Sequence, residues 1–160
     1  KLAFQPGTYQ MKFGKDELAG IYRRSDVFFC NKEESQRILK TEEDDIKKLL
    51  ASIGGLGPKV AVITDGPRGA YTYDGSEFLF MPAYPDPQPP YERTGAGDAF
   101  SSTFTVALAL GKSVSEALQW APINSMSVVQ QVGARAGLLS RQQLEKFLKE
   151  APADYKPKKI

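Results

Sequence analysis

A run of five residues in the second half of the sequence combines small side chains with an acid. Thr94-Gly95-Ala96-Gly97-Asp98 leads into an apolar stretch with helical spacing. The N-terminus of a helix favours an anion, because its first N–H groups lack partners and its dipole is positive there. A carboxylate beside such amides can accept a proton from an attacking hydroxyl while the amides stabilise the transferred phosphoryl group. The run therefore predicts phosphoryl transfer, with Asp98 as the base and the amides of Gly95, Ala96 and Gly97 as an anion hole.

The acid also has a purely structural interpretation, since a carboxylate in the first turn compensates the helix dipole. The complete absence of His favours the chemical interpretation. It excludes His-dependent hydrolase triads, the common zinc sites and phosphohistidine chemistry, so that a general base must be a carboxylate or, less favourably, Lys, Tyr or Cys. The sequence has no Gly-x-x-x-x-Gly-Lys-Ser/Thr motif, which excludes a Walker-type nucleotide site.

Composition indicates an ordinary globular chain of 160 residues, with 41% hydrophobic and 25% charged residues. The net charge is +2, and the only basic cluster is Lys156, Lys158 and Lys159, which we interpret as a solvated terminus; nucleic acid is not expected as a partner. No apolar run reaches membrane-spanning length. The single cysteine, Cys30, is expected to be buried, and a reducing cytoplasm is the expected location.

Strand and helix patterns alternate along the chain. Strands are expected at 2–4, 26–30, 59–64, 70–73 and 77–81, and helices at 16–24, 31–40, 44–53, 96–108, 113–132 and 140–150. Such alternation predicts a mainly parallel sheet with helices on both faces. The proline-rich stretch 82–90 is expected to be an extended loop.

The run Thr-Gly-Ala-Gly-Asp-Ala-Phe resembles the second signature of the PfkB (ribokinase-like) carbohydrate kinases. In that family the Asp is the catalytic base and the Gly-Ala-Gly amides form the anion hole, which gives these roles to Asp98 and to Gly95, Ala96 and Gly97. The resemblance implies the α/β fold of the family, a ribokinase-like three-layer α/β/α sandwich with a mainly parallel sheet. It also implies ATP and Mg²⁺ as cofactors and a sugar or nucleoside as the phosphoryl acceptor.

Two earlier segments resemble other motifs of the family in order and spacing. Asn31-Lys32-Glu33-Glu34 resembles the Asn-x-x-Glu motif, which positions Mg²⁺, largely through water, and the phosphates; Glu34 is the implied metal residue. Thr64 and Gly66 resemble the Thr-x-Gly turn that contacts the phosphates and ribose of ATP. Structural alternatives stay open, because Asn31 could be only a helix cap, Glu34 only a surface acid, and Thr64 with Gly66 only an exit from a strand.

Three further residues are implied contacts of the nucleotide. Thr94 begins the signature, Asn124 stands where the family commonly has an Asn near the adenine-side pocket, and Gly133 belongs to a segment that resembles the loop closing over the nucleotide. Asn124 could equally be a polar residue beside Pro122, a proline that we expect to kink its helix.

The residues before the signature depart from the family pattern. Family members usually have Asp-Thr where this sequence has Glu92-Arg93. That Asp often joins a monovalent-cation site in potassium-dependent members, so dependence on K⁺ is left open here. Arg93 adds positive charge next to the phosphates, and we hypothesise that it partly replaces the cation.

Family members are considerably longer than this chain, which begins without Met. Residues 1–160 are therefore expected to be a single nucleotide-binding and catalytic domain, the C-terminal part of a longer kinase, and the isolated fragment is expected to be inactive. Pairing with the missing N-terminal half, or a homodimer, would complete it. The alternative is a non-catalytic half-domain that binds nucleotide or a partner and lacks the substrate pocket.

Overall fold

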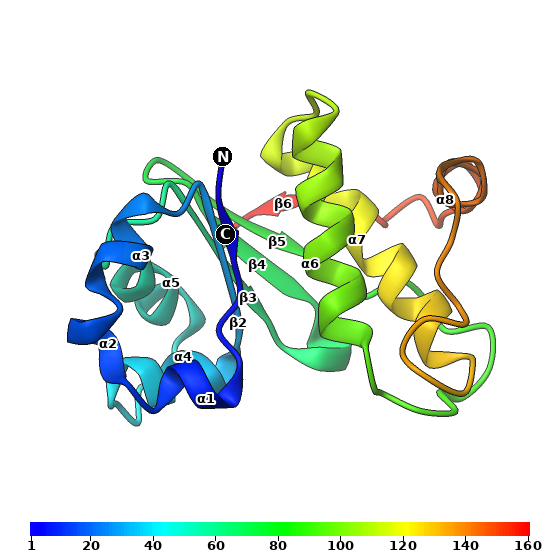
Figure 1. Ribbon diagram of the computed structural model, residues 1–160. Helices are drawn as coiled ribbons and strands as arrows, with labels where there is room; N and C mark the ends of the chain where they lie inside the picture. The colour runs from blue at the N-terminus through cyan, green and yellow to red at the C-terminus, as the bar shows by residue number, and fades with distance from the viewer. The chain divides into compact units, whose positions relative to one another are not determined.

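Apolar runs up to Met81 form five strands of a six-stranded sheet, and two lysines near the C-terminus form the sixth (Figure 1). The computed structural model describes residues 1–160. The strands lie side by side in chain order: β1 (Ala3–Phe4), β2 (Val27–Asn31), β3 (Val60–Thr64), β4 (Ala70–Tyr73), β5 (Phe78–Met81) and β6 (Lys158–Lys159). β1, β2 and β3 are parallel, and β4 is antiparallel to β3. The predicted parallel arrangement is thus confirmed for the first three strands, and the whole sheet is mixed.

Contacts within the chain group it into two compact units. The first contains residues 1–66, 70–80 and 159–160, and the second contains residues 67–69 and 81–158. The prediction that residues 1–160 work as one catalytic domain stays a prediction.

Five helices belong to the first unit: α1 (Thr8–Met11), α2 (Gly14–Glu17), α3 (Ala19–Arg24), α4 (Lys32–Leu39) and α5 (Ile46–Gly54). The single helix expected at 16–24 is instead divided at Leu18, whose dihedral angles of −88° and 2° interrupt the helical repeat. The Leu18 side chain is buried, so this corner is held by packing. Helix α1 was not predicted, because four residues are too few to give a periodic pattern.

The core of the first unit lies between the sheet and helices α3, α4 and α5. Strands β2 and β3 contribute Phe28, Cys30, Ala61 and Ile63, and the helices contribute Tyr22, Ile38, Leu49, Leu50 and Ile53, all buried. Cys30 is free and buried, as predicted, and burial raises the pKa of its thiol. This packing fixes the ends of β2 and β3.

Three longer helices dominate the second unit: α6 (Ala96–Ala109), α7 (Val114–Val129) and α8 (Arg141–Lys149). Helices α6 and α7 pack against each other. Both α7 and α8 begin with a capping box, in which Ser113 pairs with Glu116 at α7 and Ser140 with Gln143 at α8. Pro122 lies inside α7, which ends at Val129, three residues earlier than predicted.

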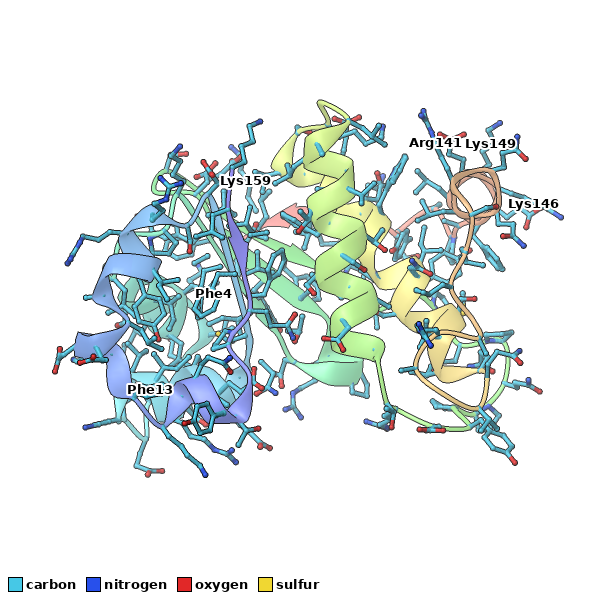
Figure 2. The ribbon with its side chains drawn as sticks, viewed as in Figure 1. Phe4, Phe13, Arg141, Lys146, Lys149 and Lys159 are labelled. Atoms are coloured by element: carbon cyan, nitrogen blue, oxygen red, sulfur yellow. The ribbon has the colours of Figure 1, made fainter.

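Helix α8 lies within the range 140–150 that the sequence predicted and is amphipathic. Leu144 is its buried residue. Figure 2 shows the basic side chains of Arg141, Lys146 and Lys149 pointing away from the helix. None of the helices combines the length and the apolar character that crossing a membrane requires.

The basic C-terminus is more ordered than the sequence predicted. Lys158 and Lys159 form β6, the Ile160 N–H donates to the Phe78 carbonyl at 3.2 Å, and Lys159 Nζ lies 2.7 Å from a carboxylate oxygen of Glu77. Lys156, Lys158 and Lys159 are all exposed, as expected of a solvated terminus, whereas the pairing of β6 in the sheet was not predicted. A two-residue strand leaves no alternation in the sequence, so local pattern cannot reveal it.

Candidate active site

Two residues predicted to contact the nucleotide end neighbouring parallel strands. Asn31 is the last residue of β2, Thr64 is the last residue of β3, and the two are paired in the register of the sheet. In open α/β sheets, ligands bind outside the carboxyl ends of the strands. Gly66 follows in the left-handed region at φ 53°, exposed and with open space where a Cβ would stand. The first unit therefore brings Asn31, Thr64 and Gly66 to one end of its sheet.

Asn31 and Glu34 are joined by reciprocal hydrogen bonds at the start of α4. The Glu34 N–H donates to Asn31 Oδ1 at 2.8 Å, and the Asn31 N–H donates to Glu34 Oε2 at 2.8 Å. The helix-cap interpretation of Asn31 is thus confirmed as a structural role. It does not conflict with ligand contact, because Asn31 is exposed and Glu34 is half-buried.

The residues around Glu34 suit a magnesium ion that is held partly by the phosphates of a nucleotide. The cap bond reaches Oε2 of Glu34, and the carboxylate has a second oxygen, Oε1. No group of three or more His, Cys, Asp or Glu side chains lies close enough together to hold a metal ion on its own. Mg²⁺ characteristically keeps several waters and is held by one or two carboxylates together with substrate phosphates. The single carboxylate of Glu34, in the first turn of α4, matches that mode of binding.

In the second unit, the signature run forms a tight turn into α6. Gly95 is the N-cap residue at φ 84° and makes no side-chain cap, whereas α4, α5, α7 and α8 are all capped by side chains. The Ala96 N–H donates to the Arg93 carbonyl at a long 3.3 Å. Gly97 and Asp98 lie in the first helical turn, where N–H groups have no acceptor within the helix, and both residues are exposed.

Only glycine fits at position 95. Its φ of 84° is strained for a residue with a side chain, and an added Cβ would lie 2.7 Å from the Cα, Cβ and carbonyl oxygen of Ala134. Real Cβ atoms do not approach backbone so closely, so the turn and the segment after α7 are in tight contact. The turn therefore depends on a segment remote in sequence.

Hydrogen bonds fasten the same turn to α7 and the segment after it. Ser125 Oγ donates to the Ala96 carbonyl at 2.8 Å, and the Gly133 N–H donates to Glu92 Oε2 at 3.1 Å. The Glu92 carboxylate also accepts a hydrogen bond from the Thr94 side chain, and these two bonds, that of Thr94 foremost, lower the pKa of Glu92. Thr94 and Gly133, both predicted nucleotide contacts, are thus linked through Glu92.

Asn124 is buried and fully engaged with protein atoms. Its Nδ2 donates to Thr103 Oγ1 at 2.7 Å, and its Oδ1 accepts from the Leu139 N–H at 3.0 Å. The side chain is 6% exposed. It ties α7 to α6 and to the segment before α8, and its contact with adenine stays a prediction.

Sequence reasoning missed Ser127 and Ala134 as supports of the site. Ser127 Oγ donates to the Gly137 carbonyl at 2.7 Å, and Gly137 packs so closely on the Ser127 backbone that a Cβ there would overlap it. Half-buried serines at positions 125 and 127 on a largely buried helix were the signal available, because a hydroxyl shielded from water needs a protein partner. The hydrogen-bond partners of these serines lie tens of residues away or in an irregular segment, so no local sequence pattern identifies them.

Comparisons with known proteins agree with this arrangement. A family model described as "pfkB family carbohydrate kinase" matches residues 7–141. Cytidine kinase of Thermococcus kodakarensis is 35% identical over 119 residues, covering 72% of this chain and 41% of the relative. Ribokinase of Bacillus subtilis is 37% identical over 93 residues, covering 58% of this chain and 31% of the relative.

A solved structure has the same fold. Ribokinase of Arabidopsis thaliana, complexed with ribose and ATP, superposes with a TM-score of 0.75 at 29% identity, over 82% of this chain and 43% of the other. The predicted ribokinase-like α/β fold is confirmed. The chain spans less than half the length of these three proteins. The matched family model covers most of the sequence and includes both the strand ends at Asn31 and Thr64 and the turn at Asp98, and the chain belongs to the pfkB family of carbohydrate kinases.

Proposed function

We propose that the protein transfers the terminal phosphoryl group of ATP to an alcohol group of a sugar or nucleoside. The observation that carries the proposal is the turn into α6, where a helix N-terminus without a side-chain cap stands next to the exposed acid Asp98. Amides aimed at a developing anion stabilise it strongly, and a carboxylate at hand can take a proton. Kinase relatives acting on cytidine and ribose support the same reaction class.

In the proposed reaction Asp98 accepts the proton of the attacking hydroxyl. The hydroxyl oxygen forms a bond to the terminal phosphorus, the bond from that phosphorus to the bridging oxygen breaks, and ADP leaves with the electron pair. The N–H groups of Gly95, Ala96 and Gly97 stabilise the negative charge on the transferred group. Of these three, the Ala96 N–H has a competing acceptor in the Arg93 carbonyl, but at 3.3 Å that bond is weak.

The cofactors of the proposed reaction are ATP and Mg²⁺. In the first unit, Asn31 and Glu34 act on the phosphates and on Mg²⁺, with Glu34 reaching the ion through water, while Thr64 and Gly66 contact the phosphates and ribose. The ion supplies charge neutralisation on the phosphates. In the second unit, Thr94, Asn124 and Gly133 are the proposed contacts of the nucleotide.

The acceptor site and the partners are part of the proposal. Because the chain spans less than half the length of its curated relatives, the residues that select the sugar or nucleoside are proposed to lie mostly outside these 160 residues. A polypeptide equivalent to the remaining half of such a kinase, or a second copy of this chain, would complete the pocket. The reducing cytoplasm is the proposed location.

A panel of acceptors tests the proposed function. The complete protein, with any sequence that flanks these 160 residues, is incubated with ATP, Mg²⁺ and one sugar or nucleoside at a time, and ADP and phosphomonoester are measured. Formation of ADP that depends on one acceptor and matches the phosphomonoester in amount is the expected result. ADP formation with no dependence on any acceptor in the panel would contradict phosphoryl transfer to an alcohol.

Potassium is tested in the same assay. Arg93 is exposed next to the turn, and we propose that its charge partly replaces a monovalent cation. Titration with K⁺ is then expected to change the turnover number by less than about twofold. Strong stimulation by K⁺ would refute this role of Arg93.

A second candidate is a half-domain that binds nucleotide or a partner without catalysis. The helix N-terminus at Gly95, which has no side-chain cap, would hold a phosphate group whether or not Asp98 acts as a base. Nucleotide binding without turnover, unchanged by replacing Asp98, would distinguish this candidate from the kinase.

A further inference from the structure

Glu92 occupies a junction between two segments that are far apart in the sequence. Its Oε2 accepts the Gly133 N–H at 3.1 Å across 41 residues, and its carboxylate also accepts a hydrogen bond from the Thr94 side chain. We call this set of two bonds the Glu92 bridge. The bridge thus connects Thr94, the residue before Gly95 in the turn, with Gly133, which lies four residues after the end of α7.

The segment beyond Gly133 is held at its other end as well. Ser127 Oγ donates to the Gly137 carbonyl at 2.7 Å, which fastens the far end to α7. Between the two anchors, Ala134 is in contact with Gly95 closely enough to leave no room for a Cβ. Movement of residues 133–137 is thus coupled sterically to the turn that carries Gly95.

The backbone just before the turn is fixed independently. The N–H groups of Tyr91 and Glu92 donate to the Val129 carbonyl at 2.8 Å and 3.2 Å, at the end of α7. These bonds hold the main chain of Glu92, so its side chain is free to serve the two partners described above. Removing the carboxylate would therefore release Gly133 and Thr94 without detaching residues 91 and 92 from α7.

We infer that Glu92 is a positioning residue, which holds the amides of the Gly95–Gly97 turn in register with Asp98 by clamping residues 133–137 against Gly95. The inference rests on the proposed function, since the turn is the proposed anion hole. Glu92 touches neither ATP nor the acceptor in this role. It acts through Thr94, Gly133 and Ala134.

Three replacements of Glu92 differ in side-chain length and in acceptor oxygens, so each is expected to affect the bridge differently. Glu92→Ala removes both bonds, and Glu92→Asp, shorter by one methylene, cannot span to Gly133 without a shift of the main chain. Glu92→Gln keeps one acceptor oxygen at full length and retains part of the bridge. Loss of the bridge is expected to lower kcat by about 10- to 50-fold for Ala and Asp, because small misplacements of catalytic groups are costly.

Kinetics separate positioning from simple loss of stability. For Glu92→Ala kcat is expected to fall, and the KM for ATP is expected to rise by a smaller factor than kcat falls, because Thr94 and Gly133 are also proposed contacts of the nucleotide. Glu92→Gln is expected to restore kcat to within about threefold. Glu145→Ala is the matched control, since Glu145 is a surface acid on α8 that pairs with Arg141 at 2.8 Å. An unchanged kcat in Glu92→Ala, or a change in KM for ATP alone, would overturn the inference.

Hydrogen exchange tests the bridge without activity. Amides of residues 132–137 and 94–98 are expected to exchange about tenfold faster in Glu92→Ala than in wild type or Glu145→Ala, because their opening becomes easier. Unaltered exchange in both segments would overturn the bridge. If the wild-type protein transferred no phosphoryl group, the proposed function and the positioning role would both fall, while the exchange result would still decide whether the bridge exists.

Discussion

Asn31 and Thr64 face each other at the carboxyl ends of the parallel strands β2 and β3. The register of these strands turns two residues that are far apart in the sequence into neighbours. Each strand is a continuous apolar run that stops at a polar residue, so the same feature that ends the buried strand also provides the side chain at its end. The proposed phosphate contacts of the first unit therefore follow from how its core is built.

Replacing Glu34 by Gln separates its structural role from its proposed role with Mg²⁺. Gln at this position can still accept the Asn31 N–H, so the capping box survives and the free energy of unfolding is expected to change by less than about 0.5 kcal/mol. Loss of the negative charge is expected to raise the Mg²⁺ concentration needed for half-maximal activity by about tenfold or more. Metal titrations of activity, together with urea unfolding, measure both effects.

The control for Glu34 is the equivalent change in another capping box. Glu116 Oε2 accepts the Ser113 N–H at 2.8 Å at the start of α7. Glu116→Gln is expected to leave the Mg²⁺ dependence at the wild-type value. An equal Mg²⁺ dependence in Glu34→Gln and wild type would show that Glu34 serves only as a cap.

Gly95→Ala is expected to lower activity for two reasons, backbone strain and overlap with Ala134. The same change at Gly111 separates the two effects. Gly95 and Gly111 have nearly the same φ, 84° and 82°, but only Gly95 has neighbours within 4 Å of an added Cβ. Gly111→Ala thus measures the backbone strain alone, about 1–2 kcal/mol. Gly95→Ala is expected to cost about 1–3 kcal/mol more through overlap with Ala134 and to lower kcat by about 100-fold or more.

Thermal unfolding and turnover of the two glycine variants give the comparison. Gly111→Ala is expected to keep wild-type turnover. If Gly95→Ala were no less stable than Gly111→Ala and equally active, the close contact between the turn and Ala134 would be refuted.

Asn124→Ala is expected to destabilise the protein by about 1–3 kcal/mol, because it leaves the Thr103 hydroxyl and the Leu139 N–H without their buried partner. Combining it with Thr103→Val tests the cause. The Asn124 Nδ2 to Thr103 Oγ1 bond of 2.7 Å predicts that the double variant loses less stability than the sum of the single variants. Additive losses in urea unfolding would show that the two side chains are not coupled.

Asp26 makes part of the stability depend on pH. Its hydrogen bonds with Lys59 Nζ at 2.7 Å and with the Leu2 N–H at 2.8 Å, Lys59 foremost, lower its pKa from 3.8 to about 2. A carboxyl whose pKa is depressed by folding contributes stability above its unfolded pKa, and this contribution disappears as the pH falls through the folded value. The difference in urea midpoint between wild type and Asp26→Asn is therefore expected to be fully present at about pH 6 and largely lost near about pH 2.

Asp154→Asn provides the comparison for Asp26, since Asp154 is an exposed acid after α8. Its effect on the urea midpoint is expected to be small at both pH values. A difference between wild type and Asp26→Asn that persisted at the lowest pH would contradict the role of the ionised carboxylate.

The sequence predicted those features of the fold that local pattern encodes. The apolar runs of β2 and β3 and the Asn31 cap of α4 each occupy a few consecutive residues, so periodicity and capping rules identify them. Local pattern placed the start of α5 at Asp44, whereas Asp45 is the cap because its Oδ1 accepts the N–H groups of Lys47 and Lys48. The division of the helix at Leu18 and the pairing of β6 depend on tertiary packing and were not predicted.

In the candidate site, too, only residues that are close together in the sequence could be predicted. The run Gly95 to Asp98 stands out because the acid directly follows the three residues whose N–H groups form the proposed anion hole. The contacts of Glu92 with Gly133, of Gly95 with Ala134 and of Asn124 with Leu139 do not, because each joins segments at least 15 residues apart and involves backbone atoms, which have no side-chain signature. Sequence reasoning therefore identified Asp98 as the proposed base and missed the residues that hold its turn in place.

The measurement that tests the proposed role of Asp98 most directly is turnover by Asp98→Asn beside wild type, with the best acceptor of the panel, ATP and Mg²⁺. Asn keeps the size of the side chain but cannot accept the proton of the hydroxyl. The turnover number is expected to fall by about 100-fold or more while the affinity for ATP stays within about threefold of wild type. Wild-type turnover in Asp98→Asn would contradict the assignment of Asp98 as the base.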